Sequence, residues 1–114
     1  MILNEGLNRI RDLINTDLDK GQSGTGTTLP TAGDAGLETA VAATLLDLTG
    51  TVKTDRVITT THSVDSTLAN GSNLTEHEVR LSSGDSVNRV VHASISKTVA
   101  IEIDYIDTFF IEGS

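Results

Sequence analysis

The chain has 114 residues, a net charge of −8 from 8 Lys and Arg against 16 Asp and Glu, 3% aromatic residues and no cysteine. This acidic excess disfavours binding to nucleic acid, no apolar run reaches the roughly 20 residues of a membrane span, and disulfides and thiolate metal sites are excluded. We expect a single domain over residues 1–114, without a cofactor, whose small core gains burial from contacts between subunits.

Residues 1–20 have the spacing of an amphipathic helix running from 4 to 20, and lack the features of a secretory signal. Asn4 is the expected N-cap, and Gly21 after Lys20 is the expected stop signal. The helix either covers the chain's own sheet or docks on a neighbouring subunit. Its predicted contact residues are Leu3, Leu7, Ile10 and Ile14, widened by Leu13 and Leu18.

Residues 21–43 are rich in Gly and Thr and predict a loop followed by a short helix over 36–43. The GTGT at 24–27 lacks the Gly-Lys-Ser/Thr ending of a Walker loop and the spacing of a dinucleotide fingerprint. Phosphate binding is therefore not expected.

From residue 44 onward, dense Val, Ile and Thr alternate with polar residues and indicate a β domain over 44–114. We predict a mainly β fold, an antiparallel meander or small β-sandwich of about five strands with one N-terminal amphipathic α-helix. The expected strands cover residues 44–54, 56–66, 74–81, 86–95 and 99–112.

The last of these strands has the clearest two-residue period in the chain. One side is apolar except at Asp107, and the other is acidic near its start. Phe109 and Phe110 fall on opposite sides, so one ring needs a cover other than the domain's own core. Phe109, Phe110 and Ile111 are therefore the expected contact residues at the sheet end.

His62, His77 and His92 lie fifteen residues apart in three successive predicted strands. A transition metal would need all three side chains to converge on one face. Alternation places His77 on the face of Val79 and His92 opposite Val91, so we expect neither convergence nor a metal.

The carboxylates give no catalytic or calcium motif. Glu102 and Asp104 fit a glycosidase pair only if a cleft lies between them, and an acidic solvent face explains both. No D-x-[DN]-x-[DN]-G loop surrounds the remaining aspartates, and no Ser-His-Asp order is evident. The aspartates weighed as calcium ligands are Asp47, Asp55, Asp65 and Asp85.

Four segments together resemble a family of small virion proteins of tailed viruses, encoded among tail, baseplate and fibre genes. They are LNEGLNRIRDLI, GTGTTLPTAGDAGLETAV, LTEHEVRLSSGDSVNRVV and SKTVAIEIDYIDTFFIE. The chain departs from the family's pattern at Val79-Arg80-Leu81, where relatives often carry Gly-Leu-Phe. The few lysines and the acidic excess point to a halophilic host, including an archaeal one, although an acidic mesophilic domain has the same composition.

The resemblance implies a non-enzymatic structural protein, located in the virion's tail, baseplate or fibre region and assembled in the host cytoplasm. Its implied partners are copies of itself, in a ring or trimer, and other virion proteins. Two alternatives have similar composition, namely a capsid-side decoration or turret protein and a receptor- or glycan-binding module.

Overall fold

The computed structural model describes residues 1 and 3–112. It begins with helix α1, Asn4–Asp17, which continues directly into strand β1, Leu18–Gly24. The helix is three residues shorter than predicted, because the chain becomes extended at Leu18 and pairs with a later strand. Asn4 is the first helical residue and not the N-cap. Leu3 holds that position without a side-chain hydrogen bond.

The strands form two antiparallel sheets. The first has the order β2-β1-β5-β6 and the second β3-β4-β7, which we call the three-stranded sheet. The bounds are β2 Leu46–Asp47, β3 Gly50–Thr54, β4 Val57–Val64, β5 Asn73–Leu81, β6 Ser86–Ser96 and β7 Ile103–Phe110. The predicted mainly β fold with one N-terminal helix is confirmed. The predicted strand at 99–112 is shorter at both ends.

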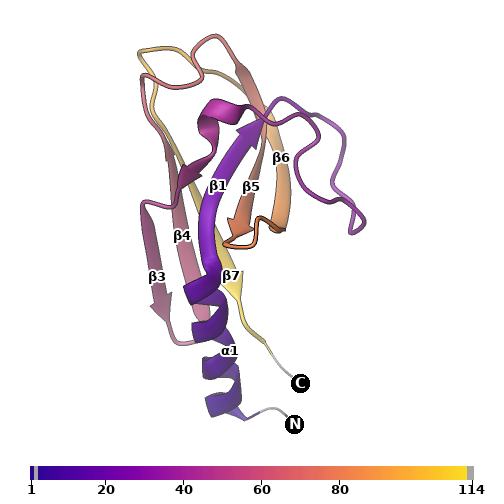
Figure 1. The fold of residues 1–114 in the computed structure, drawn as a ribbon, viewed down its shortest axis with the longest axis vertical. Coiled ribbons are helices and arrows are strands. Elements are labelled where there is room, and N and C mark those ends of the chain that lie inside the picture. The colour runs from indigo at the N-terminus through magenta and orange to yellow at the C-terminus, as the bar shows by residue number, and fades with distance from the viewer. Residues whose placement is uncertain (2, 113–114) are drawn as a thin grey trace.

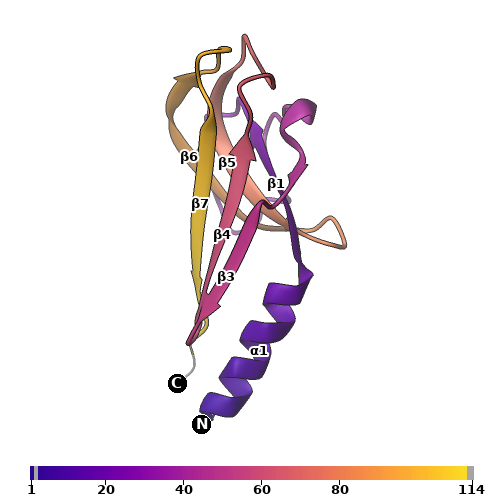
Figure 2. The same ribbon diagram turned by 90° about the vertical axis from the view of Figure 1, so that its left-hand side faces the viewer.

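The two sheets face each other, and α1 extends beyond them at one end (Figures 1 and 2). The described chain is elongated, with principal extents of 49 × 28 × 24 Å. Both β6 and β7 end their sheets, so each has one edge without a hydrogen-bonded neighbour strand in the described chain. No helix in residues 1 and 3–112 has the length and apolar character needed to cross a membrane.

The interior between the sheets has two apolar clusters with a polar layer between them. The helix-side cluster consists of Leu18, Ile58 and Val79, and the far cluster of Val64, Leu74 and Ile103. Strand β4 alternates strictly between buried and half-buried residues, and its inner side carries Ile58 and Val64 at the ends with Thr60 and His62 between them. This period of two confirms that β4 has one face inward.

Residues 25–41 form an irregular segment that covers the outer side of β5. The predicted helix over 36–43 is wrong, because only Ala42–Thr44 forms a short 3-10 turn (η1). The end of the segment pairs with β1 at a bridge between Gly24 and Ala40. Strand β5 is therefore covered on both sides, which explains why six consecutive residues, Leu74 to Val79, are buried.

Candidate assembly surfaces and the polar interior

The apolar side of helix α1 is wider than the part of it that packs on the chain's own sheets. Leu7 is 3% exposed and Ile14 packs on the helix-side cluster. Leu3, Ile10 and Leu13 are 69%, 40% and 55% exposed. The four predicted contact residues thus split into an inner pair and an outer pair. We call Leu3, Ile10 and Leu13 the helix stripe, and its spacing of seven and three residues places it on one side of the helix.

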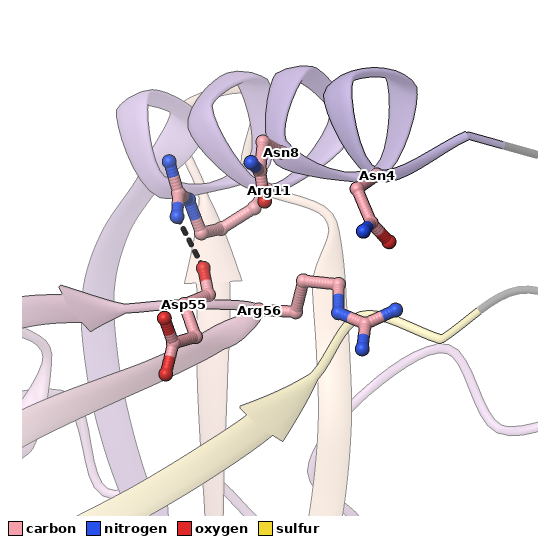
Figure 3. A pocket seen from close by; sticks show the side chains of 5 residues that line it. All are labelled: Asn4, Asn8, Arg11, Asp55 and Arg56. Atoms are coloured by element: carbon pink, nitrogen blue, oxygen red, sulfur yellow. Dashed lines mark hydrogen bonds between the residues drawn. The ribbon is translucent and has the colours of Figure 1, made fainter.

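A clasp holds α1 against the turn between β3 and β4 (Figure 3). Arg11 donates from its guanidinium to the backbone carbonyl of Asp55 and to the carboxylate of Asp12. Lys53 of β3 contacts the same Asp12 oxygen at 3.0 Å, and the two cations hold the pKa of Asp12 below its usual value. A polar notch of about 380 Å³ beside the clasp is lined by Asn4, Asn8, Arg11, Asp55 and Arg56.

The side of the three-stranded sheet that faces away from the interior forms a second exposed surface. It carries Val52, Ile106 and Phe110, which are 62%, 66% and 66% exposed. Thr59 lies between Val52 and Thr108 in register, so apolar and β-branched residues run across all three strands. Asp104 is the single charged residue among the described outward positions of these strands. We call this surface the outer face.

The three residues predicted at the sheet end lie as follows. Phe109 packs half-buried against the helix-side cluster, while Phe110 points to the outer face. The two rings therefore lie on opposite sides of β7, as the alternation predicts. Ile111 is half-buried and donates its N–H to the carbonyl of Arg56 at 2.8 Å.

A stack of aromatic rings crosses the interior. The ring of Tyr105 lies parallel to that of His77, with centroids 4.1 Å apart, and His62 lies 5.3 Å from His77. Nε2 of His77 lies 2.6 Å from Oδ2 of Asp107, and Asn88 donates to the other oxygen of that carboxylate at 3.4 Å. Asp107, the interruption in the apolar side of β7, thus faces inward to meet a polar partner.

His62 is completely buried on β4. Its Nε2 donates to the carbonyl oxygen of Thr44 at 2.8 Å, which leaves Nδ1 as the unprotonated nitrogen. Burial lowers the pKa of His62 to about 4, against the opposing effect of the Thr44 carbonyl. A Cβ built on Gly21 would lie 2.4 Å from Cγ of this ring. Gly21 is therefore not a helix terminator but a point in β1 that His62 approaches closely.

All three histidines lie around Tyr105, whereas the alternation predicted that His77 and His92 would not share a side. Nε2 of His92 lies 3.0 Å from the hydroxyl of Tyr105. His92 keeps the alternation of β6, but its side is the inner one, because Val90 pairs with His77 on that side and Val91 pairs with Glu76 on the outer side. Within residues 1 and 3–112, no group of three or more His, Cys, Asp or Glu side chains is arranged to hold a metal ion.

Ser23, His77 and Asp107 occupy neighbouring strands, an arrangement that the sequence order did not suggest. Ser23 is paired with His77 in the register of β1 and β5. No hydrogen bond joins the Ser23 hydroxyl to His77 in the described chain, and Ser23 is 0% exposed. A nucleophile needs both an adjacent base and access for a substrate, and Ser23 has neither here. His77 and Asp107 join the two sheets through their hydrogen bond, and Ser23 lies beside them.

A buried carboxylate anchors the irregular segment to β5. Glu76, 0% exposed, accepts hydrogen bonds from the backbone N–H groups of Gly26, Glu38 and Thr39 at 2.7–2.9 Å. Arg89 of β6 donates to it at 2.8 Å. Burial raises the pKa of Glu76, but these donors outweigh burial and hold it below its usual value. We call this arrangement the Glu76 anchor.

The other carboxylates weighed for chemistry are dispersed. Glu102 is exposed before β7, and Asp104 on the outer face accepts a hydrogen bond from Ser63 at 2.7 Å. The four aspartates weighed as calcium ligands lie at four separate places: Asp47 in β2, Asp55 after β3, Asp65 after β4 and Asp85 after β5.

A groove of about 480 Å³ separates the free edges of β6 and β7. Val90 and Ile95 line it from β6, and Ile103 and Ile106 from β7. His92 and Tyr105 bridge it with their hydrogen bond. The edge of β7 is therefore not covered by β6.

No protein family, curated protein or solved structure matches this chain.

Proposed function

We propose that this chain is a non-enzymatic structural subunit of a tailed-virus virion, placed in the tail, baseplate or fibre apparatus, that assembles through contacts between copies. The observation that carries the proposal is the pair of exposed apolar surfaces on one small acidic chain. These are the helix stripe and the outer face, which lie on different elements.

Two unlike surfaces favour head-to-tail assembly. A contact between the stripe of one copy and another surface of the next is heterologous, and such contacts close into rings or continue as filaments. The resemblance of the four sequence segments is what points to a virion, and it is independent of this geometric argument.

We propose that copies of the chain assemble in molar salt. Copies with a net charge of −8 repel each other at low ionic strength, and that repulsion is screened within about 3 Å at 1 M salt. Both surfaces carry few charges, so their burial is hydrophobic and persists in salt.

The test is the mass of the purified full chain, measured by sedimentation between low and molar salt. We expect a defined oligomer that is favoured by salt. Leu13→Asp should dissociate it by placing a charge in the helix stripe, whereas Thr16→Asp, on an exposed position of the same helix, should not. A chain that remains a monomer at every salt and protein concentration would refute assembly by self-contact.

Placement in the particle needs a separate measurement. Labelled antibodies against the chain should bind at the tail or its tip. Labelling of the head would support the capsid-side decoration or turret protein instead, and the absence of the chain from purified particles would refute the virion proposal.

A further inference from the structure

We infer that copies of this chain join by strand pairing, with the free edge of β7 in one copy against the free edge of β3 in the next. The inference rests on the proposed assembly function and names a second contact between neighbouring copies, in addition to the one made by the helix stripe. Both strands end the same three-stranded sheet, so this pairing would continue one sheet from copy to copy.

The register shows which backbone groups of β7 are available. The N–H of Ile111 donates to Arg56, and the paired register continues through Ile58 with Phe109 and Thr60 with Asp107. Since bonded and non-bonded pairs alternate, the residues between them present their N–H and C=O to the free edge. These residues are Asp104, Ile106, Thr108 and Phe110.

The same reasoning applies to β3. Residues 58, 60, 62 and 64 of β4 bond to residues 109, 107, 105 and 103 of β7. The residues of β4 between them, 57, 59 and 61, therefore bond to β3 on the other side. Their register partners are Thr54, Val52 and Gly50, which leaves Thr51 and Lys53 facing the free edge. An incoming strand finds space at β7, because the groove of about 480 Å³ lies beside it.

Side chains on the outer face favour the pairing of unlike edges. Pairing β7 with β3 of the next copy places Val52 beside the side of β7 that carries Ile106 and Phe110. Asp104 is the one charge that β7 presents on this face, and no described residue of β3 on the same face carries a charge. Two β7 edges would instead bring a second Asp104 onto the joined face, where like charges are destabilising, so β7 against β3 is the preferred pair. Asp107 is bound by His77 and Lys53 by Asp12, so these two charges do not take part in the choice.

The direction of the strands agrees with head-to-tail repetition. Strands β3 and β7 are each antiparallel to β4 and therefore parallel to one another. Joining β7 to β3 of the next copy makes a parallel pair that repeats by the same rotation each time. The outer faces then become continuous, and Val52 of one copy approaches Ile106 and Phe110 of another.

The test uses proline to remove single edge N–H groups from the full chain. Thr108→Pro blocks the β7 edge and Thr51→Pro blocks the β3 edge, and neither removes a bond to β4. Each variant should raise the concentration for half-assembly by at least about tenfold. Thr108→Val and Thr51→Val keep the N–H and should assemble like the wild type.

Mixing the two proline variants gives a sharper result. Each retains the edge that the other has lost, so at a concentration where each alone is monomeric, an equimolar mixture should form a dimer and nothing larger. If β7 paired with β7, Thr51→Pro alone would assemble normally, and this would overturn the inference. Assembly of both proline variants at wild-type concentrations would also overturn it, while leaving the proposed function intact if Leu13→Asp still dissociates the oligomer.

Amide hydrogen exchange on the wild type provides a measurement that does not depend on the folding of a variant. The amides of Ile106 and Thr108 should exchange at least about tenfold more slowly at assembling than at dilute concentrations. The amide of Asp107 faces β4 and should change less. Equal exchange of Ile106 and Thr108 in oligomer and monomer would contradict the inference, whereas a chain that is monomeric throughout would refute the proposed function.

Discussion

Nε2 of His77 lies 2.6 Å from Oδ2 of Asp107, and this pair joins β5 of one sheet to β7 of the other. It lies between the helix-side and far apolar clusters, and both side chains are largely buried. His77 is 2% exposed, so its polar nitrogen depends on this partner. A hydrogen bond to a charged group in such a place contributes more than one at the surface.

Asp107→Ala is therefore expected to lower the free energy of unfolding by about 2 to 3 kcal/mol, because it strands the buried nitrogen of His77. Urea denaturation at neutral pH measures this. Glu102→Gln, an exposed carboxylate before β7, serves as the matched control and should change stability by less than about 0.5 kcal/mol. Equal stability of the two variants would show that the pair does not hold the sheets together.

The Glu76 anchor leads to a second prediction. Glu76→Ala leaves the N–H groups of Gly26, Glu38 and Thr39 and the cation of Arg89 without their acceptor. Removing one partner of a buried ion pair costs about 3 to 5 kcal/mol, and residues 25–41 should become the first site of proteolytic cleavage. Limited proteolysis with mass identification of the fragments tests this.

Glu38→Gln is the control for that experiment. Glu38 lies in the same segment but is exposed, and its oxygen accepts from Thr27 and Thr28. Removing the charge of Glu38 should leave residues 25–41 protected from the protease, since the Glu76 anchor to β5 remains. Cleavage within 25–41 at the same rate in both variants would indicate that Glu76 does not order the segment.

The close approach of β1 to β4 gives a third prediction. Gly21→Ala would place a methyl group 2.4 Å from Cγ and 2.7 Å from Cβ of His62, so the ring or the strand must move. We expect a loss of about 1 to 3 kcal/mol in urea denaturation. Gly33→Ala meets nothing within 4 Å and should be nearly neutral. A neutral Gly21→Ala would mean that the two sheets lie further apart at this point.

Strands β4 and β7 follow from local sequence, and β1 does not. Strand β4, VITTTHSV, is rich in β-branched residues, which is enough to predict a strand, although its alternation is seen only in the burial of its side chains. Strand β1, LDKGQSG, has no β-branched residue and two glycines. Its burial depends on contacts between residues far apart in the chain. Gly21 lies close to the ring of His62, and the carbonyl oxygen of Ser23 accepts a hydrogen bond from the hydroxyl of Thr44.

The candidate surfaces were predictable only in outline. Helical spacing marked Leu3, Leu7, Ile10 and Ile14 together, because an apolar residue at that spacing has the same signature whether it faces its own sheet or a partner. Which of the four residues pack on the chain's own sheets depends on where β4 and β5 lie relative to the helix. The stack around Tyr105 was missed because the side of β6 that includes Val91 reads as the core side, whereas Val91 pairs with Glu76 on the outer side and His92 faces the interior.

His62 gives the last prediction, which concerns acid. Its pKa is about 4 in the folded chain and near 6.5 when unfolded, so the unfolded chain takes up a proton first as the pH falls. Stability is thus fully present above about pH 6.5 and is lost as the pH approaches 4, by about 2 kcal/mol between pH 7 and pH 5. In urea denaturation at these two pH values, His62→Gln should lose about 2 kcal/mol less than the wild type, since Gln keeps a donor for Thr44 and does not titrate. An unchanged pH dependence in His62→Gln would assign the acid sensitivity to other groups.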